Sequence, residues 1–261
     1  LSAKLLNCFS KDSPTEIPPQ ILCISFKKGS GTIFFTGCNL RCAFCQNYEV
    51  SRAKRGKAIT PSALADIFKE REDMGAENIS LVTPSHLTAY LLRAFEIYKP
   101  KIPVVYNTSS YEKVDTLQRI DPYIDIYLPD FKYYNKESAK EYSNAPDYMD
   151  YVKPAIDEML SQVGNPVFDK YGIIKKGIIV RHLLLPNHLE ESKEIIKYLY
   201  DTYKKVMPIG AGTCELCTAC TYPDAPCRFP DRAFTSMEAY GLLVTDVCKS
   251  ADTPYYCGRN T

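Results

Sequence analysis

Residues 31–47 read GTIFFTGCNLRCAFCQN, a short apolar run followed by a loop with three cysteines. The run 32–36 has the β-branched and aromatic residues that favour a strand. Cys38, Cys42 and Cys45 follow with the spacing C-x3-C-x2-C. Three thiolates on one loop can converge on a soft metal centre. Because a closed site needs four ligands, one position would stay open, as in catalytic rather than structural sites.

The spacing Cys38-x3-Cys42-x-Phe44-Cys45 resembles the cluster motif of the radical S-adenosylmethionine (SAM) enzymes. The longer run 31–51 resembles the subgroup related to pyruvate formate-lyase activating enzymes. The resemblance implies that the cysteines hold a [4Fe-4S] cluster whose fourth iron binds the amino and carboxylate groups of SAM. Electron transfer then cleaves SAM to methionine and a 5'-deoxyadenosyl radical. On the residues alone, a fragment of a zinc site or a chance spacing is the alternative.

The composition is ordinary for a soluble globular protein, with 45% hydrophobic and 24% charged residues. A net charge of +1 points to no nucleic-acid partner and no acidic membrane. No apolar stretch is long enough to span a bilayer, and no signal peptide is visible. We therefore expect a cytoplasmic protein. The chain starts at Leu1 rather than Met, as a fragment or a trimmed product would.

Seven of the eleven cysteines fall in two tight groups, at 38–45 and 214–227. Such spacing favours metal binding in a reducing compartment over a disulfide framework. The remaining thiols are interpreted as buried or incidental, namely Cys8, Cys23, Cys248 and Cys257.

From residue 32 to about 203, apolar strand-like runs alternate with amphipathic helical stretches. The predicted strands are 32–36, 78–83, 103–107, 124–128 and 177–185. The predicted helices are 60–75, 87–98, 111–120, 149–163 and 195–203, and a polar, tyrosine-rich connection spans 133–147. Apolar strands that are each followed by a helix predict an α/β fold with a parallel sheet covered by helices.

A barrel and an open doubly wound sheet fit this alternation equally well. The resemblance favours the partial (β/α)6 barrel of radical SAM enzymes, which leaves a lateral opening for a macromolecular substrate. Five βα units are clear, whereas the sixth strand, near 206–209, is doubtful. The predicted organisation is an N-terminal extension at 1–30, the partial barrel at 31–205 and a small cysteine-rich metal-binding module at 206–261.

Polar residues follow the predicted strands at the edge where barrels carry out their chemistry. They are Thr83, Ser85, His86, Asn107, Asp130, Lys132, Arg181 and His182. Each one alone is equally consistent with a strand-end cap or a turn. Together they offer the hydroxyl, amide, carboxylate and basic groups that would hold the parts of SAM. Phe44 is expected to keep water from the cluster and to present a flat face to adenine.

Family motifs refine this set. Asp130-x-Lys132 resembles the D-x-K motif that helps activating enzymes hold SAM, and Arg181 resembles an arginine that contacts SAM. The run LVTPSH at 81–86 resembles the signature of the related subgroup, where other members carry Gly-Gly-Glu for the SAM amine. Because that motif is absent, Thr83 and Ser85 are only candidates for binding the amine.

A second set of cysteines, Cys214-x2-Cys217-x2-Cys220-x6-Cys227, has the number and spacing of a closed four-thiolate site. A second [4Fe-4S] cluster is the first interpretation, zinc the second and unpaired thiols the third. Residues 210–256 resemble a predicted metal-binding cysteine-rich family, through C-x2-C-x2-C, CRFP and SMEAYG. The junction is either a gene fusion or an artefact of a chimeric sequence.

The main functional hypothesis is a radical SAM enzyme similar to the activases of glycyl radical enzymes. The implied partners are SAM, an electron donor such as flavodoxin or ferredoxin, and a glycyl radical enzyme or other protein substrate. No catalytic residue is assigned beyond the cluster and SAM, and no nucleic-acid or membrane partner is expected. The alternative is a non-catalytic iron–sulfur or zinc protein in electron transfer or assembly, which a missing sixth strand would favour.

Overall fold

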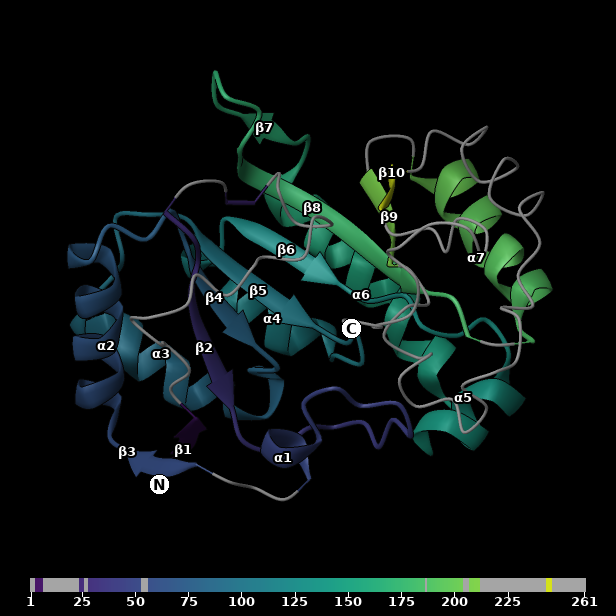
Figure 1. Cartoon of the computed structure of the whole chain (residues 1–261), viewed down its shortest axis with the longest axis horizontal. Coiled ribbons are helices and arrows are strands. Elements are labelled where there is room, and N and C mark those ends of the chain that lie inside the picture. Colours follow the sequence, from purple (N-terminus) through teal and green to yellow (C-terminus); the bar gives the residue numbers. More distant parts are fainter. Residues whose placement is uncertain are drawn as a thin grey trace, which may run out of the picture.

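A sheet of mostly parallel strands runs through the computed structural model, with helices packed along it (Figure 1). The structure describes residues 3–6, 24–25, 28–52, 56–185, 187–203, 207–211 and 243–245. The parallel strands are β2 (Gly31–Phe35), β4 (Ile79–Val82), β5 (Val104–Thr108), β6 (Ile126–Pro129), β8 (Ile174–Leu183), β9 (Met207–Ala211) and β10 (Leu243–Thr245). The strands β1 (Ala3–Leu6), β3 (Lys57–Ile59) and β7 (Val167–Phe168) pair in antiparallel fashion.

The α-helices are α1 (Tyr48–Ser51), α2 (Pro61–Asp73), α3 (Thr88–Ile97), α4 (Val114–Ile120), α5 (Lys136–Ser143), α6 (Tyr148–Val163) and α7 (Leu189–Thr202). Two short 3₁₀ helices, η2 (Ser85–Leu87) and η3 (Asp121–Tyr123), precede α3 and follow α4. Within the residues that the structure describes, no helix is both long and apolar enough to cross a lipid bilayer.

The order of the strands decides between the two architectures that the alternation allowed. The sheet runs β10-β9-β8-β6-β5-β4-β2-β1-β3, so the parallel strands lie side by side in the order of the chain. A doubly wound sheet would reverse direction at a switch point, and this order has no such reversal between β2 and β9. The fold is therefore a partial (β/α) barrel with a mostly parallel sheet.

The sixth parallel strand, which was doubtful from the sequence, is β9. It pairs with β8 in parallel, with Arg181 opposite Ile209 and Leu183 opposite Ala211. Its sequence, MPIGA, contains Pro and Gly, both of which are depleted in strands. Pairing with β8 thus forms this strand despite the low intrinsic preference of Pro and Gly for strands.

The predicted strands and helices are confirmed, with ends that move by a few residues. In α2, Thr60 Oγ1 accepts a hydrogen bond from the Ala63 amide at 3.1 Å, and Pro61 occupies the first helical position. This is the predicted cap. The polar, tyrosine-rich connection 133–147 contains a helix, α5, that was not among the predicted ones.

Alternation along the strands separates two faces of the sheet. On β5, Tyr106 belongs to the core that the helices cover, whereas Val105 belongs to a smaller apolar cluster on the opposite face. Because successive strand residues point to opposite faces, Thr108 lies on the same face as Tyr106, and Asn107 lies on the same face as Val105. Figure 1 shows α4 and α6 behind the strands, on the helix-covered face. The opposite face carries polar residues at its carboxyl edge.

Candidate metal and cofactor site

The cysteine loop begins directly after β2. Cys38, Cys42 and Cys45 are free and partly buried. Each sulfur has a hydrogen-bonding neighbour: the Leu40 amide donates to Cys38 Sγ at 3.4 Å, and Ser143 Oγ donates to Cys42 Sγ at 3.0 Å. The third pair is Cys45 Sγ and Ser51 Oγ, 3.2 Å apart. All three thiols are therefore held by groups that can donate to a thiolate.

The three thiols influence one another electrostatically. The pKa of the Cys38 thiol is raised to about 11, mainly by burial and in smaller part by the neighbouring Cys42 and Cys45, whereas the Leu40 amide and the Lys132 ammonium act in the opposite direction. Among the described residues, however, no three His, Cys, Asp or Glu side chains are grouped to hold one metal ion. The structure thus does not support convergence of the thiols on a single ion.

A cluster sets a different geometric requirement, because each cysteine binds its own iron and the thiols need only surround the group. Three thiols on one loop, each with a hydrogen-bonding neighbour and with a lysine nearby, have the chemistry that such a cluster requires. The donor set therefore fits a [4Fe-4S] cluster with one open iron.

Helix α5 holds the loop from the side. The Arg41 amide donates to the Ser143 carbonyl at 3.1 Å, and the Ala43 amide donates to the Tyr142 carbonyl at 2.7 Å. The Ser143 hydroxyl, which contacts Cys42, also lies 2.6 Å from the Tyr133 hydroxyl. The end of α5 thus fixes both the backbone of the loop and one sulfur.

The start of α5 depends on a residue from another helix. Glu191 of α7 accepts hydrogen bonds on Oε1 from the Tyr134 amide at 2.7 Å, the Asn135 amide at 2.8 Å and the Ser138 hydroxyl at 2.6 Å. It therefore holds the residues that lead into α5, although it lies 56 residues from Asn135. Local sequence reasoning has no access to a contact at this separation, so α5 was missed.

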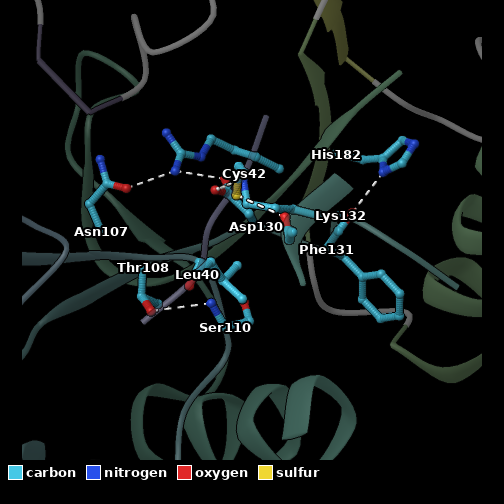
Figure 2. Close-up of polar contacts among 12 residues, drawn as sticks. Leu40, Cys42, Asn107, Thr108, Ser110, Asp130, Phe131, Lys132 and His182 are labelled. Carbon is cyan, nitrogen blue, oxygen red and sulfur yellow. Dashed lines mark hydrogen bonds and ion pairs between the residues drawn. The ribbon is translucent and has the colours of Figure 1, made fainter. Parts of the chain in front are cut away.

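Four of the predicted site residues come together at the ends of β5, β6 and β8 (Figure 2). Arg181 Nη2 donates to Asn107 Oδ1 at 2.7 Å and pairs with Asp130 Oδ1 at 2.7 Å. Lys132 Nζ pairs with Asp130 Oδ2 at 2.7 Å. We call these four residues the strand-end cluster. Two cations thus share one carboxylate, which leaves the cluster with excess positive charge.

The pKa values in the cluster reflect this pairing. Burial alone would raise the pKa of Asp130, but Arg181 and Lys132 outweigh burial and lower it. Burial would lower the pKa of Lys132, but Asp130 and the Cys42 thiol outweigh burial and raise it. Lys132 Nζ also lies 5.9 Å from the centre of the Phe44 ring. Phe44 and Lys132 therefore connect the cysteine loop to the strand-end cluster.

One donor in this cluster has no partner. The buried Nε of Arg181 makes no hydrogen bond to any residue that the structure describes. Because an unsatisfied buried donor is costly, this N–H is suited to an acceptor on a bound molecule. The carboxylate of SAM is such an acceptor.

Three other predicted residues do not bring their side chains to the strand-end cluster. Ser85 donates its hydroxyl to Glu112. His86 Nε2 lies 2.8 Å from the Thr36 carbonyl, and a Cβ added to Gly37 would meet His86 Nε2 at 3.1 Å. His86 therefore supports the turn that leads into Cys38.

Thr83 differs from these two because its role lies in the backbone. Its φ of 57° is rare for a β-branched residue, and its amide donates to the Asn107 carbonyl at 2.9 Å. Such strain is concentrated at functional sites.

Sequence reasoning missed Glu112, which is 3% exposed. Its Oε1 accepts hydrogen bonds from Ser85 and Thr108 and a longer one, 3.4 Å, from the Tyr106 hydroxyl. Burial raises its pKa. A glutamate four residues after a strand carries no signal of burial, so only the fold identifies it.

Residues 32–209 match the model of the radical SAM superfamily. This chain belongs to the radical SAM superfamily. Residues 180–261 also match a family described as predicted metal-binding protein, DUF2284. The second set, Cys214, Cys217, Cys220 and Cys227, falls within this match and lies outside the described residues.

Two curated relatives are each similar to part of this radical SAM chain. An uncharacterized protein of Methanocaldococcus jannaschii is 33% identical over 173 residues, which cover 62% of this chain and 46% of the relative. A pyruvate formate-lyase-activating enzyme of Streptococcus mutans is 24% identical over 179 residues, which cover 63% of this chain and 62% of the relative. The chain thus spans less than two thirds of either relative. Membership of the radical SAM superfamily implies a [4Fe-4S] cluster and SAM.

His182 has a structural position in this radical SAM fold. It is 4% exposed, with Nδ1 2.7 Å from the Phe131 carbonyl and Nε2 2.9 Å from Ser192 Oγ. Figure 2 shows it beside Phe131, the residue between Asp130 and Lys132. Burial lowers the pKa of His182 to about 4. The ring is therefore neutral at pH 7, with the Nδ1 proton directed at the carbonyl.

This pKa predicts a loss of stability in mild acid. The ordinary pKa of 6.5 applies to the unfolded chain, so below it the unfolded state binds a proton that the folded state resists. The contribution of His182 to the free energy of unfolding should fall by about 3 kcal/mol as the pH drops from 6.5 to 4. Urea titrations of wild type and His182→Gln at several pH values measure the difference. Equal pH slopes in the two proteins would contradict this assignment.

Proposed function

We propose that this chain cleaves SAM reductively, with a [4Fe-4S] cluster held by Cys38, Cys42 and Cys45. The observation that supports this most directly is the strand-end cluster beside the cysteine loop. Lys132 lies close enough to Cys42 for the two groups to interact electrostatically, and its ammonium lies over the face of Phe44. A group bound by the thiols would therefore border the residues suited to SAM.

The residues of this chain have separable tasks in the proposal. Arg181 offers its free Nε–H to the SAM carboxylate, and Asn107 and Asp130 offer oxygens to the amine or the ribose diol. Phe44 excludes water and faces the adenine. When bound, the cluster supplies the electron that cleaves SAM to methionine and a 5'-deoxyadenosyl radical.

Thr83 and Ser85, the candidates for the SAM amine, are left out of this assignment. Ser85 donates to Glu112, on the helix-covered side of β5. The proposal therefore rests on the strand-end cluster for all polar contacts with SAM.

The substrate we propose is a glycyl radical enzyme, from which the radical removes a hydrogen atom. The similarity to a pyruvate formate-lyase-activating enzyme supports this, at 24% identity. A protein substrate also suits a partial barrel, because its lateral opening admits a polypeptide. An electron donor such as flavodoxin or ferredoxin would complete the system.

The alternative, a non-catalytic electron carrier, depended on an incomplete barrel. Strand β9 supplies the sixth parallel strand beside β8. The parallel sheet from β2 to β9 therefore does not lack the strand whose loss would have favoured this alternative. A SAM-binding titration distinguishes the two functions, since an electron carrier has no reason to bind SAM.

The proposed function predicts SAM cleavage by the reconstituted protein. Under anaerobic conditions with dithionite and SAM, the wild type should release 5'-deoxyadenosine, and Cys42→Ala should not, because the cluster loses one of three ligands. Cys248→Ala, outside both cysteine groups, is the matched control and should retain activity. A wild type that binds about four irons per site but never cleaves SAM would refute the proposal.

Ser143 provides a test of the thiol environment. Its hydroxyl donates to Cys42 Sγ at 3.0 Å, and a hydrogen bond to sulfur stabilises the more negative, reduced cluster. Ser143→Ala should therefore lower the reduction potential by roughly 40 mV, the equivalent of a hydrogen bond of about 1 kcal/mol for one electron. EPR-monitored redox titration measures it. Ser143→Thr keeps the hydroxyl and should retain the potential; an equal shift in both variants would contradict the role of the hydrogen bond.

For the C-terminal part we propose a cysteine-rich module that follows the extension at 1–30 and the barrel. Because β9 pairs with β8, we place the end of the barrel at 211 rather than 205, and the start of the module after β9 rather than at 206. Its Cys214, Cys217, Cys220 and Cys227 would hold a second [4Fe-4S] cluster, with zinc as the alternative. The match to a predicted metal-binding family supports a metal there.

The two cysteine sets can be separated by substitution. A variant with Cys38, Cys42 and Cys45 changed to Ala should lose only the first cluster and keep about four irons, or one zinc, per chain. Elemental analysis with EPR identifies the metal. A metal-free variant would refute the second site.

A further inference from the structure

A small cavity lies on the helix-covered side of the sheet, apart from the strand-end cluster. Its volume is about 310 Å³, and it lies between the cysteine loop, η2, the start of α4 and α6. The lining includes Asn39, Ser85, Tyr111, Glu112, Thr116 and Tyr151. Its carboxylate, Glu112, is held by the Tyr106 and Thr108 side chains, which point away from the face that carries Asn107.

The carboxylate of Glu112 has no cationic partner in the described part of the chain. Oε1 accepts hydrogen bonds from three hydroxyl groups, whereas Oε2 accepts no hydrogen bond from any described residue. Glu112 as a whole is only 3% exposed, but its Oε2 atom is not fully enclosed. Because Glu112 lines the cavity, its free oxygen is directed to that space.

The other groups in the cavity complement a cation with several donors. The rings of Tyr111 and Tyr151 meet edge to face, with centroids 4.9 Å apart, and aromatic faces attract cations. Asn39 and Thr116 add an amide and a hydroxyl. A primary ammonium carries three donors and no acceptor, so it matches a wall of one carboxylate and several neutral oxygens.

We propose that this cavity binds a small aliphatic primary amine through Glu112. The volume is at the lower limit of ligand pockets, which suits one aminoalkyl chain rather than a nucleotide. Asn39 lies between Cys38 and Cys42, so the bound amine would sit beside the cysteine loop.

One residue of the chain competes for this position. Lys113 also lines the cavity, and its exposed side chain makes no ion pair with a described residue. If its ammonium were the natural occupant, Lys113→Met would bind an added amine much more tightly than the wild type. Similar affinity in the two proteins is the result expected for an external ligand.

The probes are n-butylammonium and its neutral counterpart 1-butanol, titrated into the full chain and followed by ligand-observed NMR and thermal unfolding. Butylammonium should bind and raise Tm, whereas butanol should do neither. Glu112→Gln keeps the shape of the side chain and an oxygen that accepts hydrogen bonds from the three hydroxyl groups, but it removes the negative charge. It should therefore weaken butylammonium binding at least tenfold. An equal response to both probes, or equal binding by Glu112→Gln, would overturn the proposal.

Two further measurements cover a failure of that variant to fold. Thr116→Leu fills the cavity without touching the hydrogen bonds of Glu112, and it should abolish butylammonium binding; unchanged binding would place the amine elsewhere. SAM should not displace butylammonium from the reconstituted protein. Mutually exclusive binding would show that the cavity is part of the SAM pocket and would overturn a separate amine site, while leaving the proposed function intact.

Discussion

The pairing of Asp130 with both Arg181 and Lys132 is the interaction on which the rest of the site depends. Both distances are 2.7 Å, and the pairing joins the ends of β6 and β8. Replacing Asp130 would leave two partly buried cations facing each other without the carboxylate between them, which is costly. One carboxylate between two cations also leaves positive charge beside three thiols. Such an excess of positive charge stabilises an anionic cluster and a carboxylate ligand.

The cysteine loop has no regular structure between β2 and α1, so its order comes from neighbours far along the chain. His86 supports the turn at Gly37, and the end of α5 pairs with the backbone on both sides of Cys42. None of these neighbouring residues is a proposed ligand of the iron–sulfur cluster. They restrict the thiols to a narrow range of positions before any metal is bound, which lowers the cost of assembling a site.

The sequence predicted what depends on local pattern and strand order. The apolar strand runs, the cap at Thr60 and the meeting of Asn107, Asp130 and Arg181 all follow from periodicity and from the shared edge of parallel strands. Contacts across long separations were not predictable. The residues that lead into α5 are held from α7, β9 has a weak strand preference without β8, and Ser85 turns to Glu112 rather than to the strand-end cluster.

One turn of α7 anchors both halves of the site. Ser192 contacts His182, which holds the Phe131 carbonyl between Asp130 and Lys132. Its neighbour Glu191 holds the residues that lead into α5, whose other end binds the cysteine loop. Two consecutive residues of α7 therefore contact both the segment that carries the strand-end cluster and the helix that holds the cysteine loop. Because β9 follows α7 and pairs with β8 opposite Arg181, the C-terminal part of the chain is joined to the barrel at this same anchor.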